Sequence, residues 1–180
     1  THPAGGPFST RMIAGDDIVL EYAVPSGKSE LKKSGNIHVS GVGYCYNHVQ
    51  VHYDNAKASA FCMININCPE GDDWQDEKKG IVRISMFIEG GWYNCSGSIV
   101  NNTAQDFTPY LLSAYHCYEG ATPEDMELWQ FDFNYESPSC ENAEPQNIKT
   151  MVGCQFRAGM PTEGGSDGLL LELNTDIPED

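Results

Sequence analysis

The two stretches Cys95-Ser96-Gly97-Ser98-Ile99-Val100 and Leu111-Leu112-Ser113-Ala114-Tyr115-His116-Cys117 decide the fold of this chain. Both read as short buried strands, and they are close enough in sequence to be neighbours in one sheet. The second stretch ends in a histidine beside a cysteine that could reach back to Cys95. An imidazole can take up and release a proton near neutral pH, and a rigid backbone keeps it within reach of a reacting group. The pattern therefore indicates His116 as a candidate general base, fixed beside a disulfide.

Short strands recur on both sides of these two stretches. Their side chains alternate with period two, as in Val82, Ile84, Met86 and Ile88, which predicts one buried face. Only residues 123–128 suggest a helical turn. Strands at this spacing predict an all-β domain, either an antiparallel barrel or a sandwich. The six expected strands cover residues 81–88, 92–100, 108–114, 128–135, 148–156 and 168–173.

The first third of the chain is organised differently. Residues 1–10 resemble a flexible lead-in, and short strands are expected over 17–24, 36–40 and 44–53. Residues 54–59 are small and polar, which is typical of a linker. The chain is therefore expected to hold one β domain preceded by a short β-rich segment.

The overall charge excludes some partners. The chain has 26 acidic and 10 basic residues and a formal net charge of -16. No Lys/Arg cluster is present to replace phosphate counterions, which argues against nucleic acid and against an anionic membrane surface. The acidic surface either solubilises an exported protein or attracts basic substrates. No run approaches the roughly 18 apolar residues of a membrane span. The start lacks a signal peptide, so an exported chain is expected to have lost its leader already.

The cysteine count points to an oxidising compartment. Seven cysteines in a chain of this size favour disulfides over zinc, because no C-x2-C pair is present. Cys45, His48 and His52 could be metal ligands, but on a strand the two histidines share one polar outer face. The acidic turn 70–77 lacks the alternating ligand order of a calcium loop, which favours a solvated turn. No metal or other cofactor is predicted.

Several motifs resemble the trypsin-like serine peptidases. The small-Ala-x-His-Cys turn stands at residues 113–117, and Asp167-Gly168-Leu169-Leu170-Leu171-Glu172-Leu173 resembles the family's Asp-x-x-Leu-Leu-x-Leu strand. The lysyl-endopeptidase-type enzymes, a secreted bacterial branch, are similar over about residues 58–175. The motifs that carry this closer resemblance are 62–71, 95–103, 137–140 and 167–174.

The resemblance implies a fold and two catalytic residues. The fold would be the first, N-terminal barrel of a chymotrypsin-like double barrel. His116 would be the general base, and Asp167 would orient its imidazole. The family's nucleophilic serine sits in a Gly-x-Ser-Gly turn that this sequence lacks, because Ser96 and Ser98 lie on a strand and Ser166 runs directly into the aspartate. The nucleophile and the oxyanion hole are expected in a second barrel beyond Asp180, so this chain alone is expected to be inactive.

The resemblance also implies disulfides. Two pairs would lie within the barrel, and Cys62 would reach a cysteine in the missing C-terminal half. Cys45 and Cys154 are not explained by the pattern, and their pairing with each other stays open. The implied pairs are Cys95 with Cys117 and Cys68 with Cys140.

A processing site is expected between the two parts of the chain. Residues 1–57 resemble the remnant of a pro-segment, and residues 58–180 the barrel. Cleavage after Lys57 would give a mature enzyme beginning at Ala58 and would make the uncleaved chain a zymogen. The alternative is an ordinary surface lysine in a polar linker.

The sequence as a whole predicts half of a secreted serine endopeptidase. The substrate would be a polypeptide, cleaved after a basic residue, Lys. The remaining C-terminal half would be a partner, joined through Cys62 if the enzyme is nicked. The location would be secreted, periplasmic or at a bacterial cell surface. The alternative is a non-catalytic barrel, either a pseudo-peptidase or a binding domain of an extracellular assembly.

Overall fold

A computed structural model of the chain describes residues 8–10, 13, 15–23, 37–43, 63–141, 143 and 145–177. The chain divides into two compact units. One unit comprises residues 1–12 and 64–180, and the other comprises residues 13–63. Among the described ranges, no helix combines the length and the apolar character that a membrane crossing requires.

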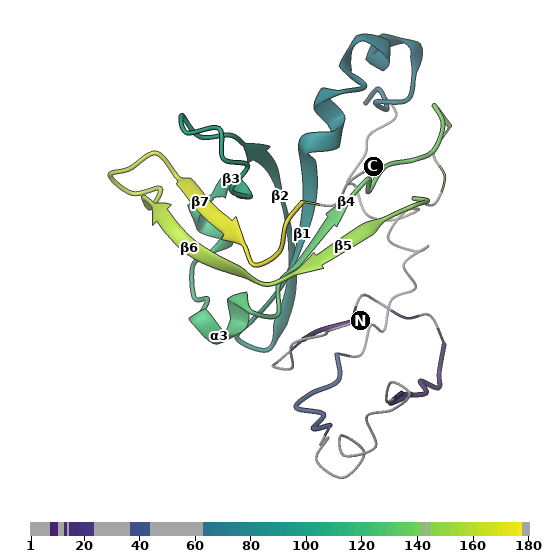
Figure 1. The fold of residues 1–180 in the computed structure, drawn as a ribbon, viewed down its shortest axis with the longest axis vertical. Helices are drawn as coiled ribbons and strands as arrows, with labels where there is room; N and C mark the ends of the chain where they lie inside the picture. Colours follow the sequence, from purple (N-terminus) through teal and green to yellow (C-terminus); the bar gives the residue numbers. More distant parts are fainter. Residues whose placement is uncertain are drawn as a thin grey trace. The chain divides into compact units, whose positions relative to one another are not determined.

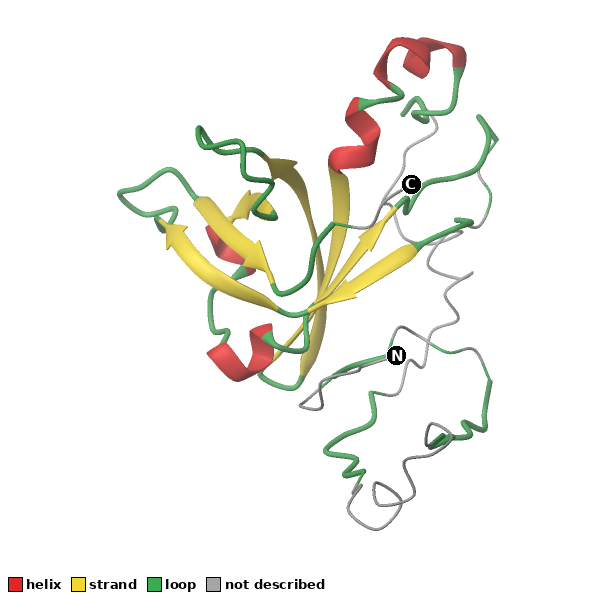
Figure 2. Ribbon diagram, viewed as in Figure 1, coloured by secondary structure: helices red, strands yellow, loops and turns green. Residues whose placement is uncertain are grey.

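The larger unit is built on one curled antiparallel sheet of seven strands, in the order β5-β4-β1-β2-β3-β7-β6 (Figures 1 and 2). Every pair of neighbours in this order is antiparallel. The strands are β1 (Ile81–Ile88), β2 (Gly91–Val100), β3 (Tyr110–Ala114), β4 (Gln130–Phe133), β5 (Lys149–Val152), β6 (Cys154–Gly159) and β7 (Gly168–Leu173). The prediction of an all-β, chymotrypsin-like barrel is confirmed.

The number of strands differs from the prediction. The single strand expected over residues 148–156 is two strands, β5 and β6, separated at Gly153. Gly153 has a φ of 87°, a left-handed conformation that glycine adopts without a steric penalty. The chain turns there, so that β5 pairs with β4 while β6 pairs with β7 at the other end of the strand order.

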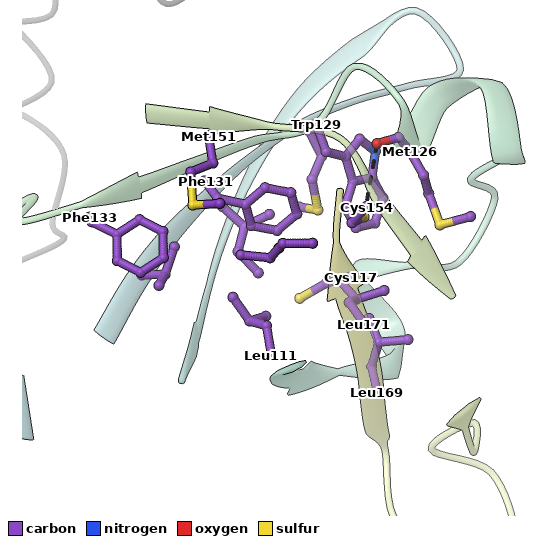
Figure 3. Close-up of a cluster of buried hydrophobic side chains, with 14 of the residues drawn as sticks. Leu111, Cys117, Met126, Trp129, Phe131, Phe133, Met151, Cys154, Leu169 and Leu171 are labelled. Atoms are coloured by element: carbon purple, nitrogen blue, oxygen red, sulfur yellow. Dashed lines mark hydrogen bonds between the residues drawn. The ribbon is translucent and has the colours of Figure 1, made fainter. Parts of the chain in front are cut away.

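The core lies inside the curl of the sheet. The predicted face of β1, with Val82, Ile84, Met86 and Ile88, is at most 5% exposed. Burial of such side chains contributes about 1.5–3 kcal/mol each. Figure 3 shows how residues from distant strands meet there. The other members of the hydrophobic core include Leu111, Cys117, Met126, Trp129, Phe131, Phe133, Met151, Cys154, Leu169, Leu171 and Leu173.

Gly97 permits the close approach of β2 and β3. A Cβ at this position would lie 2.5 Å from Leu111 Cδ2 and 2.9 Å from the carbonyl oxygen of Leu112. Any side chain would therefore push the two strands apart. The glycine of the Cys-Ser-Gly-Ser stretch thus allows β2 and β3 to lie side by side at a normal distance.

Short helical turns precede β1 and lie between β3 and β4 (Figure 2). The expected helical turn is confirmed as α3 (Pro123–Met126), which begins with a capping box formed by Thr122 and Asp125. Three 3-10 turns were not predicted: η1 (Pro69–Trp74), η2 (Glu77–Gly80) and η3 (Tyr115–Cys117).

The lead-in is anchored where the structure describes it. The buried Gln130 donates from Nε2 to Ser9 Oγ at 2.9 Å and to the carbonyl oxygen of Thr10 at 2.7 Å. Ser9 Oγ donates in turn to the carbonyl oxygen of Leu128 at 2.8 Å. The expectation of a flexible lead-in is therefore wrong for these residues, because they satisfy a buried amide.

The described residues of the smaller unit, which include 15–23 and 37–43, contain no strand. The strands expected over 17–24 and 36–40 are absent from those described positions. Val19 is 90% exposed and Leu20 56% exposed, so these apolar side chains are not buried in a core. The strand expected over 44–53 and the linker at 54–59 lie outside the described residues.

Candidate active site

The histidine turn follows directly from the end of β3. Residues Tyr115–Cys117 form η3, a single 3-10 turn. Cys117 is buried and joined to Cys95 of β2 by a disulfide with a Cα–Cα distance of 6.4 Å. This bond closes a sequence separation of 22 residues, for which the chain-entropy estimate is about 3 kcal/mol. The turn is thus fixed to the neighbouring strand at the residue after His116.

The register of the sheet brings Asp167 to this turn. Ala114 at the end of β3 pairs with Gly168 at the start of β7. Because the two strands are antiparallel, the residue after Ala114 lies opposite the residue before Gly168, which is Asp167. Accordingly, the backbone N–H of Tyr115 donates to the carbonyl oxygen of Asp167 at 2.7 Å. The backbone N–H of His116 donates to Asp167 Oδ1 at 2.9 Å.

The two side chains meet directly. His116 Nδ1 lies 2.7 Å from Asp167 Oδ2. An ionised carboxylate can only accept hydrogen bonds, so Nδ1 carries the proton in this contact. In the neutral ring the lone pair is then on Nε2. No hydrogen bond of the described residues occupies Nε2, so it is free to act as a base.

The environment keeps Asp167 ionised. The hydrogen bond from the His116 side chain, followed by that from the His116 backbone, lowers the pKa of Asp167 below its ordinary value of 3.8. The Thr162 side chain and the charge on His116 act in the same direction, while partial burial opposes them. The imidazole is 59% exposed and the carboxylate 27% exposed. The pair is therefore accessible from solvent.

Asp167 adopts an unusual backbone conformation. Its φ is 55°, in the left-handed region that residues other than glycine seldom occupy. Aspartate tolerates this region better than most residues do. The conformation lets the residue present its carbonyl oxygen and both carboxylate oxygens to η3.

No described serine completes the pair. Ser96 lies on β2, where its carbonyl oxygen accepts a hydrogen bond from Ser113 Oγ at 2.8 Å. Ser166 Oγ accepts from the backbone N–H of Gly168 at 3.3 Å. Neither hydroxyl is hydrogen-bonded to His116, in agreement with the lack of a Gly-x-Ser-Gly turn in the sequence.

The ligand atoms of Cys95, His116 and Cys117 lie within 4.8 Å of one another. This group does not fit a metal ion, because both sulfurs are bonded to each other and neither is a thiolate. The acidic turn forms η1 and η2, and its carboxylates are exposed to solvent. Cys45, His48 and His52 lie outside the described residues.

A second disulfide anchors the start of the barrel. Cys68 is bonded to Cys140 with a Cα–Cα distance of 4.3 Å. Asn65 and Asn67 support it by donating from Nδ2 to the carbonyl oxygens of Ser139 and Ser137, at 3.1 and 2.6 Å. Both disulfides that the resemblance implied are thus present in the structure.

The remaining cysteine predictions have different outcomes. Cys154 is a free, buried thiol whose Sγ lies 3.9 Å from the carbonyl oxygen of Met126. The pairing of Cys154 with Cys45, which the sequence left open, is therefore not formed. Burial, with a smaller contribution from the charge of Glu127, raises the pKa of the Cys154 thiol far above its ordinary range. Cys62, Lys57 and Ala58 lie outside the described residues.

Sequence reasoning missed two features of the site. Thr162 acts on Asp167 from the turn before β7, and no local pattern marks it. Tyr115 contributes its backbone N–H, which only the strand register could have revealed.

A comparison with protein families matches residues 56–180 to the C-terminal domain of lysyl endopeptidase. The match covers more than half of the chain and includes both members of the histidine–aspartate pair. The chain belongs to the lysyl endopeptidase family of trypsin-like serine peptidases.

Proposed function

We propose that this chain supplies the general base and the orienting carboxylate of a secreted serine endopeptidase. His116 is the base and Asp167 is its partner. The observation that carries the proposal is the 2.7 Å contact between His116 Nδ1 and Asp167 Oδ2, because it leaves Nε2 available for proton transfer.

The proposed reaction follows from that geometry. Nε2 of His116 takes the proton of a serine hydroxyl while the serine oxygen attacks the peptide carbonyl carbon. The negative charge of Asp167 stabilises the imidazolium that forms. The imidazolium then gives its proton to the leaving amine, and water hydrolyses the acyl-enzyme with His116 again acting as the base. The serine and the oxyanion hole are proposed to lie in a second barrel, in polypeptide outside these 180 residues.

We further propose that the enzyme cleaves after lysine. The family to which the chain belongs is described as lysyl endopeptidase. The formal net charge of -16 also favours association with cationic substrates and predicts that this association weakens as salt rises. Cleavage after Lys57, with a mature N-terminus at Ala58, is part of the same proposal. The two disulfides support export to an oxidising compartment.

The first test is the intact mass of the natively isolated protein with and without reductant. The proposal expects a longer chain, or a second fragment, that contains a Gly-x-Ser-Gly turn. A single species near 19.8 kDa under both conditions contradicts it and leaves a non-catalytic binding barrel.

The second test uses the complete protein. A fluorophosphonate should label its serine, and peptides with lysine before the cleaved bond should be hydrolysed faster than matched arginine or glutamate peptides. His116→Ala should reduce kcat by about 10⁶-fold. His38→Ala is the matched control, since it removes an exposed histidine of the smaller unit, and it should leave kcat unchanged. Equal rates for the two variants contradict the role of His116.

A further inference from the structure

Three aromatic side chains gather beside the histidine turn. Tyr115 belongs to η3, Tyr118 follows it directly, and Phe156 lies on β6. The rings of Tyr115 and Tyr118 meet edge to face with their centroids 5.5 Å apart, and those of Tyr118 and Phe156 lie 5.0 Å apart. We call these three residues the aromatic clamp. It joins the turn that carries His116 to a strand that the turn does not pair with.

The clamp closes over Gly159 at the end of β6. A Cβ at this position would lie 2.7 Å from Tyr115 Cδ2 and 3.1 Å from Phe156 Cε2. The Tyr115 ring therefore rests against the backbone of β6 in a space that even an alanine methyl group would occupy. The aromatic clamp lies at the surface and not in the core, because Tyr115 and Tyr118 are only half-buried and Phe156 is 37% exposed.

The end of β6 is directly connected to Asp167. Gly159 pairs with Leu169 of β7, and the backbone N–H of Met160 donates to the carbonyl oxygen of Gly168 at 2.9 Å. Gly168 follows Asp167 in the chain. Figure 1 shows β6 and β7 as adjacent strands. A displacement of η3 from β6 would consequently change the separation of His116 from Asp167.

Besides the Cys95–Cys117 disulfide and the hydrogen bonds from η3, the pair has little support from packing. Asp167 has a φ of 55°, a conformation that persists only where the surroundings hold it. The His116 side chain is 59% exposed, so packing does not fix its position. The hydrogen bonds from η3 to Asp167 depend on η3 remaining in place.

We propose that Tyr115 is a positioning residue: its ring, held by Tyr118 and Phe156 against Gly159, fixes η3 on β6 so that His116 Nδ1 meets Asp167. This inference rests on the proposed function and identifies a residue on which the orientation of the base depends. Tyr115 does not touch the reacting atoms and acts through His116.

The test measures the position of the proton on the His116 ring. Long-range ¹H–¹⁵N spectra distinguish the Nδ1–H tautomer from the Nε2–H tautomer. They should be recorded on the full 180-residue chain at about pH 8.5, above the ordinary range of imidazole titration. The wild-type chain should hold mainly the Nδ1–H tautomer. Tyr115→Ala removes the ring, and Gly159→Ala displaces it without removing it. Both should reduce the population ratio of Nδ1–H to Nε2–H at least about fivefold.

Two variants control for a merely structural effect. Tyr115→Phe keeps the ring and should therefore have the wild-type ratio of the Nδ1–H to the Nε2–H tautomer. Trp92→Ala breaks another aromatic pair, with Phe87 at 5.6 Å on the β1–β2 hairpin, and should also leave the ratio unchanged. Methyl resonances of Leu169 and Leu171 report whether each variant is folded. If Tyr115→Ala does not fold, the smaller change Gly159→Ala decides the question.

The outcomes separate this inference from the proposed function. Folded Tyr115→Ala or Gly159→Ala protein with a wild-type tautomer ratio overturns the positioning role. Loss of the ratio in Trp92→Ala as well also overturns it, because the effect would then be general. A wild-type chain without the Nδ1–H tautomer overturns both the pair and its clamp. A complete protein that has the tautomer but hydrolyses no peptide contradicts the proposed function and leaves the clamp intact.

Discussion

Asp132 and Asp167 each contact a basic side chain, and the two pairs differ in most other respects. Asp132 on β4 is 2% exposed as a residue and accepts from Arg83 Nε at 3.1 Å, from Arg83 Nη2, and from Thr150 Oγ1 at 2.6 Å. The Asp167 side chain is 27% exposed and meets a histidine that is largely open to solvent. The Asp132 carboxylate accepts from two side chains, whereas no hydrogen bond among the described residues reaches Nε2 of His116.

This difference separates a structural pair from a pair that can do chemistry. Arg83 is a permanent cation, and it is further covered by the ring of Tyr135, 3.5 Å from its guanidinium carbon. It crosses from β1 to β4 and fixes those strands. In the proposed function His116 exchanges its proton, and Asp167 orients the imidazole that does so. Stability is therefore expected to depend on Asp132, and activity on Asp167.

The largest expected loss of stability comes from breaking the buried pair. Arg83→Met leaves the Asp132 carboxylate buried without its cation, which should cost about 3–5 kcal/mol in the free energy of unfolding. Urea unfolding of the chain measures it. Arg157→Met is the matched control, because Arg157 pairs with Glu172 at 2.7 Å on the exposed surface. Similar midpoints for the two variants would show that the Asp132 pair does not hold the sheet.

Removal of each disulfide should separate stability from site geometry. In the chain-entropy estimate, Cys68→Ser with Cys140→Ser costs about 4 kcal/mol, and Cys95→Ser with Cys117→Ser about 3 kcal/mol. The first bond spans 72 residues and the second 22. Only the second adjoins His116. The Cys68/Cys140 variant should therefore lose more thermal stability, and the Cys95/Cys117 variant should lose more of the Nδ1–H tautomer of His116. If one variant shows the larger loss in both measurements, the prediction is contradicted.

A smaller effect is expected from the third partner of Asp132. Thr150→Val keeps the shape of the side chain but removes the hydroxyl that donates to Asp132 Oδ1. The loss should be about 1 kcal/mol, because Arg83 still satisfies the carboxylate. Chemical denaturation checks it, with Thr108→Val on the exposed loop as a control. A cost equal to that of Arg83→Met would mean that the hydroxyl, and not the cation, keeps the charge buried.

The smallest effect concerns acid. The pKa of Asp167 is depressed, so its ionised form contributes stability that is fully present above the ordinary value of 3.8 and is lost as pH falls through the lower folded value. The ¹³C shift of its carboxyl group should titrate below 3.8 and move upward in His116→Ala. Asp106 is the comparison group, since hydrogen bonds from the Thr108 and Asn102 side chains lower its pKa to about 2 without any histidine. If His116→Ala leaves the titration of Asp167 unchanged, the direct contact between the two side chains is contradicted.

The sequence identified the open pair more readily than the buried one. His116 and Asp167 stand in motifs whose residue types and order are specific, and alternation in β1 predicted which of its side chains are buried. Alternation does not reveal which strands are neighbours. The contact of Arg83 with Asp132 spans 49 positions and depends on the pairing of β1 with β4. A charged residue between Phe131 and Phe133 was the only local sign of it.

Other differences have the same origin in tertiary contacts. The break at Gly153 depends on a backbone conformation that an apolar run does not display. In the smaller unit, β-branched residues such as Val19 favoured a strand by propensity, but the described residues contain none, and Val19 is exposed. Tyr115 is an ordinary aromatic residue until the fold places Gly159 beneath its ring.

The most direct test of this account compares Asp167→Asn with Asp132→Asn in the complete protein, measuring kcat and the thermal midpoint of both. Asp167→Asn should reduce kcat by about 10⁴-fold with little change in the midpoint. Asp132→Asn should lower the midpoint by several degrees, while the folded protein keeps most of its kcat. If Asp167→Asn retains its kcat, or if the two variants lose activity and stability together, the division between a structural and a working pair is contradicted.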